Sequence, residues 1–151
     1  MTLYSIALFL HIVGALLLFV LLTIEGIALR QGFTAARMNR TLGPISALTI
    51  LFPGLYMTAT QWGWKGWIVV SLTAWILIAV GGAATGISLL TGRLTTRGAA
   101  ASWSIRVGMA LGVVFLMTVK PDLLVSVISV VVGAALGGVG ALASVRQARS
   151  A

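Results

Sequence analysis

LYSIALFLHIVGALLLFVLLTIEGIAL, residues 3–29, is the stretch of sequence that decides the fold. It is apolar along almost its whole length, and its main polar interruptions are His11, Thr23 and Glu25. At about 1.5 Å per residue, a helix of this length crosses the roughly 30 Å hydrocarbon core of a bilayer with some tilt. The stretch therefore predicts a transmembrane helix.

His11 and Glu25 share one face of this helix. At helical spacing, the residues that fall within roughly 40° of one another on that face are Tyr4, Ala7, His11, Gly14, Leu18, Leu22, Glu25 and Leu29. An ionisable side chain that faces lipid costs on the order of 2.5 kcal/mol or more. We therefore expect this face to turn toward other protein or water.

The composition of the whole chain agrees with a membrane protein. Of the 151 residues, 60% are hydrophobic and 8% are charged, and the mean hydropathy is +1.12. The chain has no cysteine, which excludes disulfides, thiolate metal sites and CxxC redox chemistry. Its net charge of +8 does not predict nucleic-acid binding, because the basic residues flank apolar spans and form no face of their own.

The remaining apolar stretches predict an all-α integral membrane protein, a bundle of five transmembrane helices in a single domain. We expect the helices at about residues 3–29, 42–60, 67–90, 103–119 and 122–145. Pro44 suits the first turn of the second helix, and Pro53 predicts a kink inside it that leaves the carbonyl of Thr49 without its helical donor. Lys120, Pro121 and Asp122 suit a turn between the last two helices.

Basic residues predict the orientation of the bundle. The first and third turns and the C-terminal tail hold Arg30, Arg37, Arg40, Arg93, Arg97, Arg106, Arg146 and Arg149, whereas the other two turns hold Lys65 and Lys120. Because arginine and lysine concentrate on the cytoplasmic side, we expect the N-terminus outside and the C-terminus inside. The expected location is the plasma (inner) membrane of a bacterium, where the lipid bilayer is the first partner.

Glycine pairs at GxxxG spacing predict close helix packing or a homo-oligomer. The pairs are Gly82 with Gly86, Gly108 with Gly112, and Gly133 with Gly137. In a five-span arrangement, Glu25 and Arg106 lie at matching depth near the cytoplasmic boundary and form the natural ion pair. This pair either fixes helix packing or serves as a proton or ion gate.

His11 predicts a second feature, about 12 Å inside the outer boundary. We expect a small cavity beside it, with His11 as a metal or cofactor ligand. The residues expected to bound the cavity or to supply a softer second ligand are Tyr56, Trp75, Met109, Met117, Ser126 and Ser129. The alternative is that His11 hydrogen-bonds a freed carbonyl such as that of Thr49.

Two segments carry a resemblance to known proteins. FLHIVGA, residues 9–15, resembles the first helix of bacterial membrane proteins related to the copper-resistance-D family and to the haem-carrying membrane protoporphyrinogen oxidases. FLMTVKP, residues 115–121, resembles a segment of uncharacterised bacterial membrane proteins. The resemblance implies a haem or copper ligand at His11, but the chain has a single histidine, so two histidines from one subunit cannot hold a haem.

Three classes of function follow from these features. The first is a binding or redox module in which His11 holds haem, copper or a quinone. The second is an accessory or assembly subunit that docks a membrane partner through its glycine faces. The third is a small-solute or proton-coupled transporter. An enzyme is the least expected class, because Glu25 and Asp122 fall on opposite sides of the membrane and cannot act as an acid/base pair.

Overall fold

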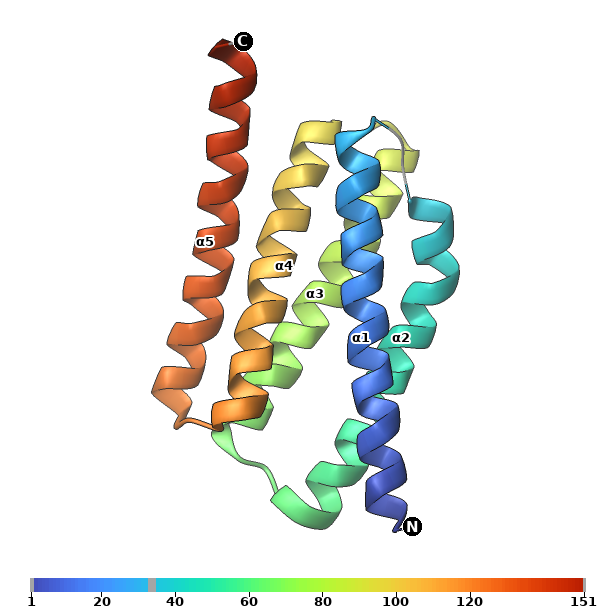
Figure 1. The fold of residues 1–151 in the computed structure, drawn as a ribbon, viewed down its shortest axis with the longest axis vertical. Coiled ribbons are helices and arrows are strands. Elements are labelled where there is room, and N and C mark those ends of the chain that lie inside the picture. Colours follow the sequence, from blue (N-terminus) through green and yellow to red (C-terminus); the bar gives the residue numbers. More distant parts are fainter. Residues whose placement is uncertain (1, 33–34, 151) are drawn as a thin grey trace. The chain divides into compact units, whose positions relative to one another are not determined.

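The computed structural model describes residues 2–32 and 35–150, and the regular elements in these ranges are all helices (Figure 1). They are α1 (Leu3–Arg30), α2 (Ala36–Met57), the π-helical turn η1 (Thr58–Trp62), α3 (Gly66–Leu90), α4 (Thr96–Val119) and α5 (Leu123–Ser150). Within this part of the chain, five helices are long and apolar enough to cross a membrane. For the residues described, the prediction of an all-helical fold with five helices long and apolar enough to span a membrane is confirmed.

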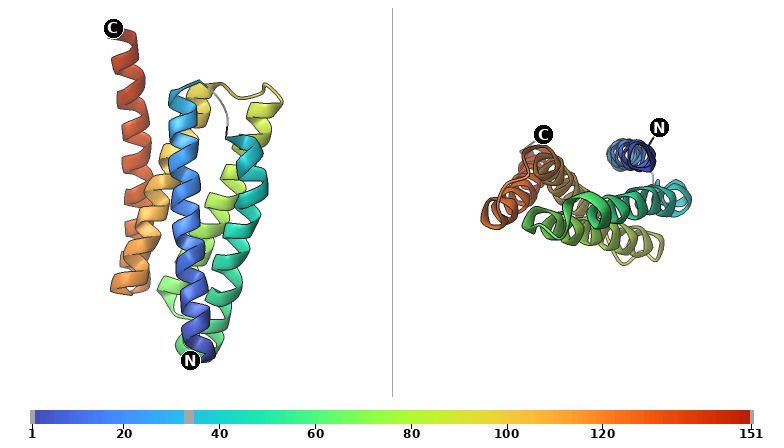
Figure 2. Two further views of the ribbon diagram at one scale, coloured as in Figure 1. Left: turned by 45° about the vertical axis from the view of Figure 1, so that its right-hand side comes forward. Right: turned by 90° about the horizontal axis from the view of Figure 1, so that it is seen from below.

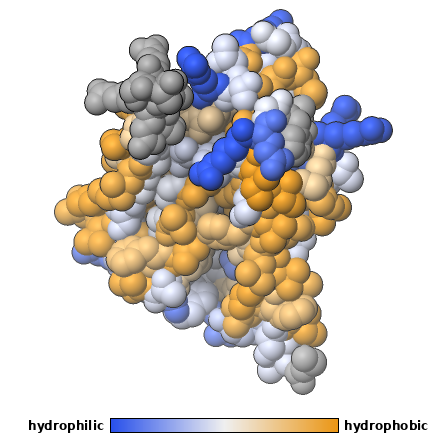
Figure 3. Space-filling model, turned by 45° about the horizontal axis from the view of Figure 1, so that its top comes forward, coloured by the Kyte–Doolittle hydropathy of each residue, from blue (hydrophilic) through white to orange (hydrophobic). Residues whose placement is uncertain are grey.

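The chain divides into two compact units, and each is described by itself. The N-terminal unit, Met1–Lys65, contains α1, α2 and η1, and the C-terminal unit, Gly66–Ala151, contains α3, α4 and α5 (Figures 1 and 2). Large hydrophobic side chains point outward along every helix, and hydrophilic side chains gather near helix ends (Figure 3). This pattern suits a protein whose solvent is lipid.

The face of α1 that the sequence predicts to be protected is the buried one. The buried residues of α1 are Ala7, Gly14, Leu21, Leu22, Glu25, Gly26, Ala28 and Leu29. They recur at helical spacing and include Glu25, and His11 on the same face is half-buried. Thr2 caps the start of α1, because its hydroxyl accepts a hydrogen bond from the backbone N–H of Ser5 at 3.3 Å.

Gly14 sets the distance between α1 and α2. A Cβ atom at this position would lie 2.9 Å from the backbone nitrogen of Ile50 and 2.9 Å from the carbonyl carbon of Thr49. Only glycine allows the backbones to approach this closely. The hydroxyl of Ser46, which is 1% exposed, uses this proximity to donate a hydrogen bond to the Gly14 carbonyl at 3.0 Å.

The second helix begins about two turns before the expected residue 42 and passes through both prolines. The segment around Arg37 and Arg40, expected as a basic loop, forms its first turns instead. Alanine, arginine and methionine are strong helix formers, so charge alone does not end a helix there. Pro44 therefore lies inside α2, on its exposed side, and not in its first turn.

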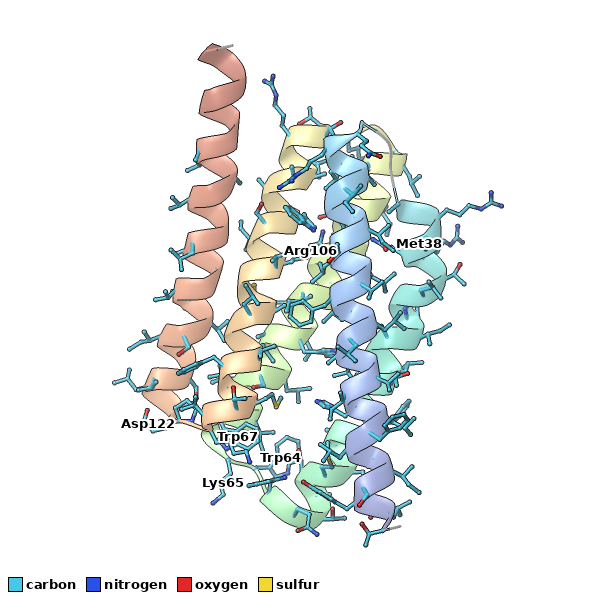
Figure 4. The ribbon with its side chains drawn as sticks, viewed as in Figure 1. Met38, Trp64, Lys65, Trp67, Arg106 and Asp122 are labelled. Atoms are coloured by element: carbon cyan, nitrogen blue, oxygen red, sulfur yellow. The ribbon has the colours of Figure 1, made fainter. Side chains whose placement is uncertain are left out.

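A π-helical turn continues α2 to Trp62. Gly63 closes it by donating its N–H to the carbonyl of Thr58 at 2.8 Å, and its φ of 63° is one that glycine adopts without strain. Trp64, which is 67% exposed, and Lys65 follow in the connection to α3 (Figure 4). An exposed tryptophan beside a lysine at a helix end is typical of a membrane interface.

Glycines bring α4 and α5 into backbone contact, as their GxxxG spacing predicts (Figure 2). A Cβ atom at Gly108 would collide with the carbonyl oxygen of Gly133, and one at Gly133 would collide with that of Gly108. Gly137 meets the backbone of Ser104 in the same way. By contrast, a Cβ atom at Gly86 or at Gly140 would meet open space in the described part of the chain.

The turn between α4 and α5 falls where the sequence predicts it. Lys120 ends α4 in the left-handed region, with φ 52° and ψ 52°, and its N–H donates to the carbonyl of Leu116 at 2.9 Å. Asp122 starts α5, because its Oδ1 accepts the N–H of Val125 at 2.9 Å (Figure 4).

The start of α4 differs from the prediction. This helix begins about two turns before the expected residue 103. Thr95 caps it there by accepting the N–H of Gly98 at 3.2 Å.

The glycine contacts between α4 and α5 predict unequal effects of the same substitution. Gly108→Ala should destabilise the protein by about 1–3 kcal/mol, because the new methyl group overlaps the Gly133 carbonyl. Gly140→Ala should be neutral or stabilising by up to about 1 kcal/mol, since alanine favours helix and meets open space. Thermal unfolding in mild detergent measures both, and equal losses would contradict this packing.

Candidate functional site

The imidazole of His11 is held against α2. Its Nδ1 lies 2.8 Å from the carbonyl oxygen of Ile50. A carbonyl oxygen can only accept a hydrogen bond, so Nδ1 carries the proton of this contact. In the neutral ring, Nε2 then keeps its lone pair. The sequence offered a carbonyl freed by Pro53, such as that of Thr49, as the alternative partner, but the acceptor is the carbonyl of the next residue, Ile50.

Gly54 lies beside the same ring. A Cβ atom at Gly54 would be 3.2 Å from both Cε1 and Nδ1 of His11, so the absence of a side chain gives the imidazole its place. Met57, one turn further on the same face of α2, is 8% exposed. Tyr56 is half-buried and lies two residues after Gly54, which places it on the other side of α2 from the contact with His11. Within the N-terminal unit, Met57 and not Tyr56 therefore shares a face with the His11 contact.

The other residues proposed for the His11 cavity belong to the C-terminal unit. Ser126 is fully buried and donates its hydroxyl to the Asp122 carbonyl at 2.6 Å, and the half-buried Ser129 donates to Val125 at 2.8 Å. Both hydroxyl protons are therefore used within α5. The other three residues predicted to line the cavity differ in exposure: Trp75 is half-buried, Met109 is 9% exposed and Met117 is 37% exposed. A cavity that these residues share with His11 stays a prediction.

Glu25 is the buried acid of α1, 9% exposed. Its Oε2 accepts a hydrogen bond from Nδ2 of Asn39 on α2 at 3.3 Å. The Oδ1 atom of the same amide is buried and has no hydrogen-bond partner. The contact ties the C-terminal end of α1 to the first turns of α2, at the opposite end of the α1–α2 pair from His11.

Arg106 is the buried base of α4, 6% exposed (Figure 4). Its side chain crosses α3 at Gly81 and Gly82, where Cβ atoms would lie 3.5 Å from its Cδ and 3.1 Å from its Nη1. Gly82, predicted to be a helix-packing glycine, therefore makes room for a guanidinium group.

A hydrogen-bonded chain accompanies Arg106 between α3 and α4. Thr85 donates its hydroxyl to the Gly81 carbonyl at 2.7 Å, and the Thr85 and Ser102 hydroxyl oxygens are 2.7 Å apart. Because the Thr85 proton is committed, Ser102 is the donor to Thr85. Ser102 lies one helical turn before Arg106, so the polar groups of both helices gather at one level.

Sequence reasoning missed several residues that hold these polar groups, namely Asn39, Ser46, Gly54, Gly81, Thr85 and Ser102. Ser46 and Gly54 could have been found, because they lie one turn before and one turn after Ile50 on one face of α2. Asn39 could not, because the prediction assigned it to a loop.

Comparisons with known proteins find no match that would help to interpret these sites. No protein-family model matches the chain, and searches of curated proteins and of solved structures find no match either. The class that the fold defines is a helical protein, with five segments able to span a membrane among residues 2–32 and 35–150.

We propose that Glu25 and Arg106 form an ion pair, as their matching depth in the sequence predicts. Glu25→Gln or Arg106→Gln alone should then cost about 3–5 kcal/mol, because each leaves a buried charge behind. The double variant should cost clearly less than the sum. Unfolding in detergent measures the cycle, with Arg93→Gln, an exposed arginine, as the control partner. Additive losses for Glu25 and Arg106 would show that the two side chains do not interact.

Proposed function

We propose that the protein is a multi-pass membrane protein that binds haem through Nε2 of His11. The observation that carries the proposal is the hydrogen bond between Nδ1 of His11 and the Ile50 carbonyl at 2.8 Å. Histidines that bind metals almost always donate their other ring N–H to a carboxylate, a backbone carbonyl or water, which fixes the tautomer and the ring orientation. His11 is anchored in this way, with the lone pair of Nε2 left to bind.

The donor chemistry of the chain favours haem over a metal ion held by protein ligands alone. Among residues 2–32 and 35–150 there is no group of three His, Cys, Asp or Glu side chains that could hold a metal ion. A porphyrin brings four nitrogen ligands of its own, so one imidazole from the protein would suffice to hold the iron. Haem would supply one-electron redox chemistry, and His11 would hold it through Nε2.

A quinol is the second candidate ligand. The lone pair of Nε2 accepts a hydrogen bond from a quinol hydroxyl, whereas a neutral ring anchored through Nδ1 has no proton to donate to a quinone carbonyl. The anchored tautomer therefore favours the reduced form of a quinone ligand over the oxidised form.

The test is the absorbance spectrum of the protein purified in mild detergent, with its haem and quinone contents. We expect a Soret band that His11→Ala abolishes. His11→Asn is the sharper variant, because its amide N–H can replace the Nδ1 donor to Ile50 while no atom replaces Nε2. It should keep the thermal stability of the wild type and lose the band.

Two other results would be informative. If the extract contains a quinol that is lost in the same two variants, the ligand of His11 is a quinol and not haem. A colourless protein without quinol would refute cofactor binding and favour the accessory subunit that docks a membrane partner through glycine faces.

We further propose that the N-terminus lies outside and the C-terminus inside the plasma membrane of a bacterium. The support is the concentration of arginine in the first and third turns and the tail, against single lysines in the other two turns. Five helices that all crossed the membrane would put the two termini on opposite sides, and the concentration of arginines supports one of the two orientations.

Cysteine labelling tests this orientation, since the chain has no cysteine of its own. Gln31→Cys and Thr91→Cys should be protected in intact cells from a thiol reagent that does not cross membranes, whereas Trp64→Cys should react. All three positions are exposed, so access depends on the side of the membrane. Labelling of Gln31→Cys and Trp64→Cys from the same side would overturn the five-span topology.

A further inference from the structure

We propose that the α1–α2 turn binds the phosphate headgroups of anionic phospholipids through Arg30, Arg37 and Arg40, called here the basic rim. Arg30 is the last residue of α1, and the other two lie in the first turns of α2. All three are exposed. The proposal concerns the opposite end of the α1–α2 pair from His11 and does not rest on cofactor binding.

The charge of the basic rim is not compensated within its own unit. Glu25 is the single acidic residue of the N-terminal unit, because the only other acid of the chain is Asp122. Its carboxylate is buried and accepts the Asn39 amide, whereas the arginines of the rim are exposed. The rim therefore presents three positive charges, which an anionic headgroup complements.

The hydrogen bond between Glu25 and Asn39 fixes the depth of the rim. It places Asn39 at the level of Glu25, about 7.5 Å along α1 from Arg30. Arg37 and Arg40 flank Asn39 and therefore start deeper than Arg30. Long arginine side chains extend from such positions toward the headgroups while their stems stay in apolar surroundings. The headgroup layer is about 5–7 Å thick on each side, so all three guanidinium groups can reach it.

The strength expected for this contact is measurable. Each arginine near an anionic surface contributes about a fivefold gain in affinity. Even with partial screening, three should favour an anionic lipid over a neutral one at least tenfold.

Native mass spectrometry of the full chain in neutral detergent, titrated with phosphatidylglycerol or with phosphatidylcholine of the same acyl chains, tests the proposal. We expect at least tenfold tighter binding of phosphatidylglycerol. The Arg30→Gln/Arg37→Gln/Arg40→Gln variant should lose the preference, and the corresponding triple lysine variant should keep most of it. Lys65→Gln removes an exposed charge from the other end of the unit and should change nothing. His11→Asn should also retain the preference, which separates this proposal from cofactor binding.

Equal affinity for the two lipids, or a preference that survives the triple glutamine substitution, would overturn the proposal. The second result would move the lipid site elsewhere, to the exposed Arg93 and Arg97 for example. If the triple variant does not fold, the three single glutamine variants replace it. Each should then lower the preference by about twofold or more, since three equal factors make up the tenfold total, and three unchanged preferences would refute the basic rim.

Discussion

Inside a bilayer, burial of apolar side chains does not bring helices together, because lipid is as apolar as leucine. Close contact between backbones takes its place, and both units of this protein depend on it. Gly14 lets α1 approach the backbone of α2, and Gly108 and Gly133 let α4 and α5 touch. Large side chains are correspondingly turned outward: Leu124 and Leu136 on α5 are 69% and 68% exposed. The helices therefore turn outward the residues that a soluble protein would bury, which suits lipid surroundings.

Hydroxyl groups in a bilayer also have to find their hydrogen-bond partners within the protein. Many of them donate to a carbonyl one turn earlier in the chain, as do Thr23, Thr41, Thr49, Thr58, Thr60, Thr73, Thr91, Thr118, Ser126 and Ser129. Ser46 and Ser102 differ, because each bonds to a neighbouring helix. Ser46 lies beside Gly14, which brings the backbones of α1 and α2 close. Thr85, the partner of Ser102, bonds to Gly81, which with Gly82 makes room for the Arg106 side chain. Polar contacts between helices thus form where small residues allow them.

Hydropathy and length were sufficient to predict the spans, because crossing a bilayer demands about 20 apolar residues whatever the neighbours are. The protected face of α1 and the turn at Lys120 also followed from spacing and from proline. The hydrogen-bond partner of each polar group could not be predicted from the sequence, because it depends on the register between helices. A shift of one residue makes Ile50 and not Thr49 the hydrogen-bond acceptor for His11. Likewise, the spacing of residues in the sequence does not show that the Arg106 side chain packs against Gly81 and Gly82. The early starts of α2 and α4 were missed because polar residues at a membrane surface form helix as readily as loop.

His11 is difficult to explain by packing alone. An interhelical hydrogen bond in a membrane is worth about 0.6 kcal/mol on average, and Ser46 already supplies one between α1 and α2, at Gly14, one turn from His11. An imidazole gives the same benefit through Nδ1 but adds a second polar atom, Nε2, at a half-buried position. Serine or threonine would secure the helices at lower cost. The added nitrogen is an advantage only when it binds something, so its place beside Gly54 favours a ligand over a purely structural role.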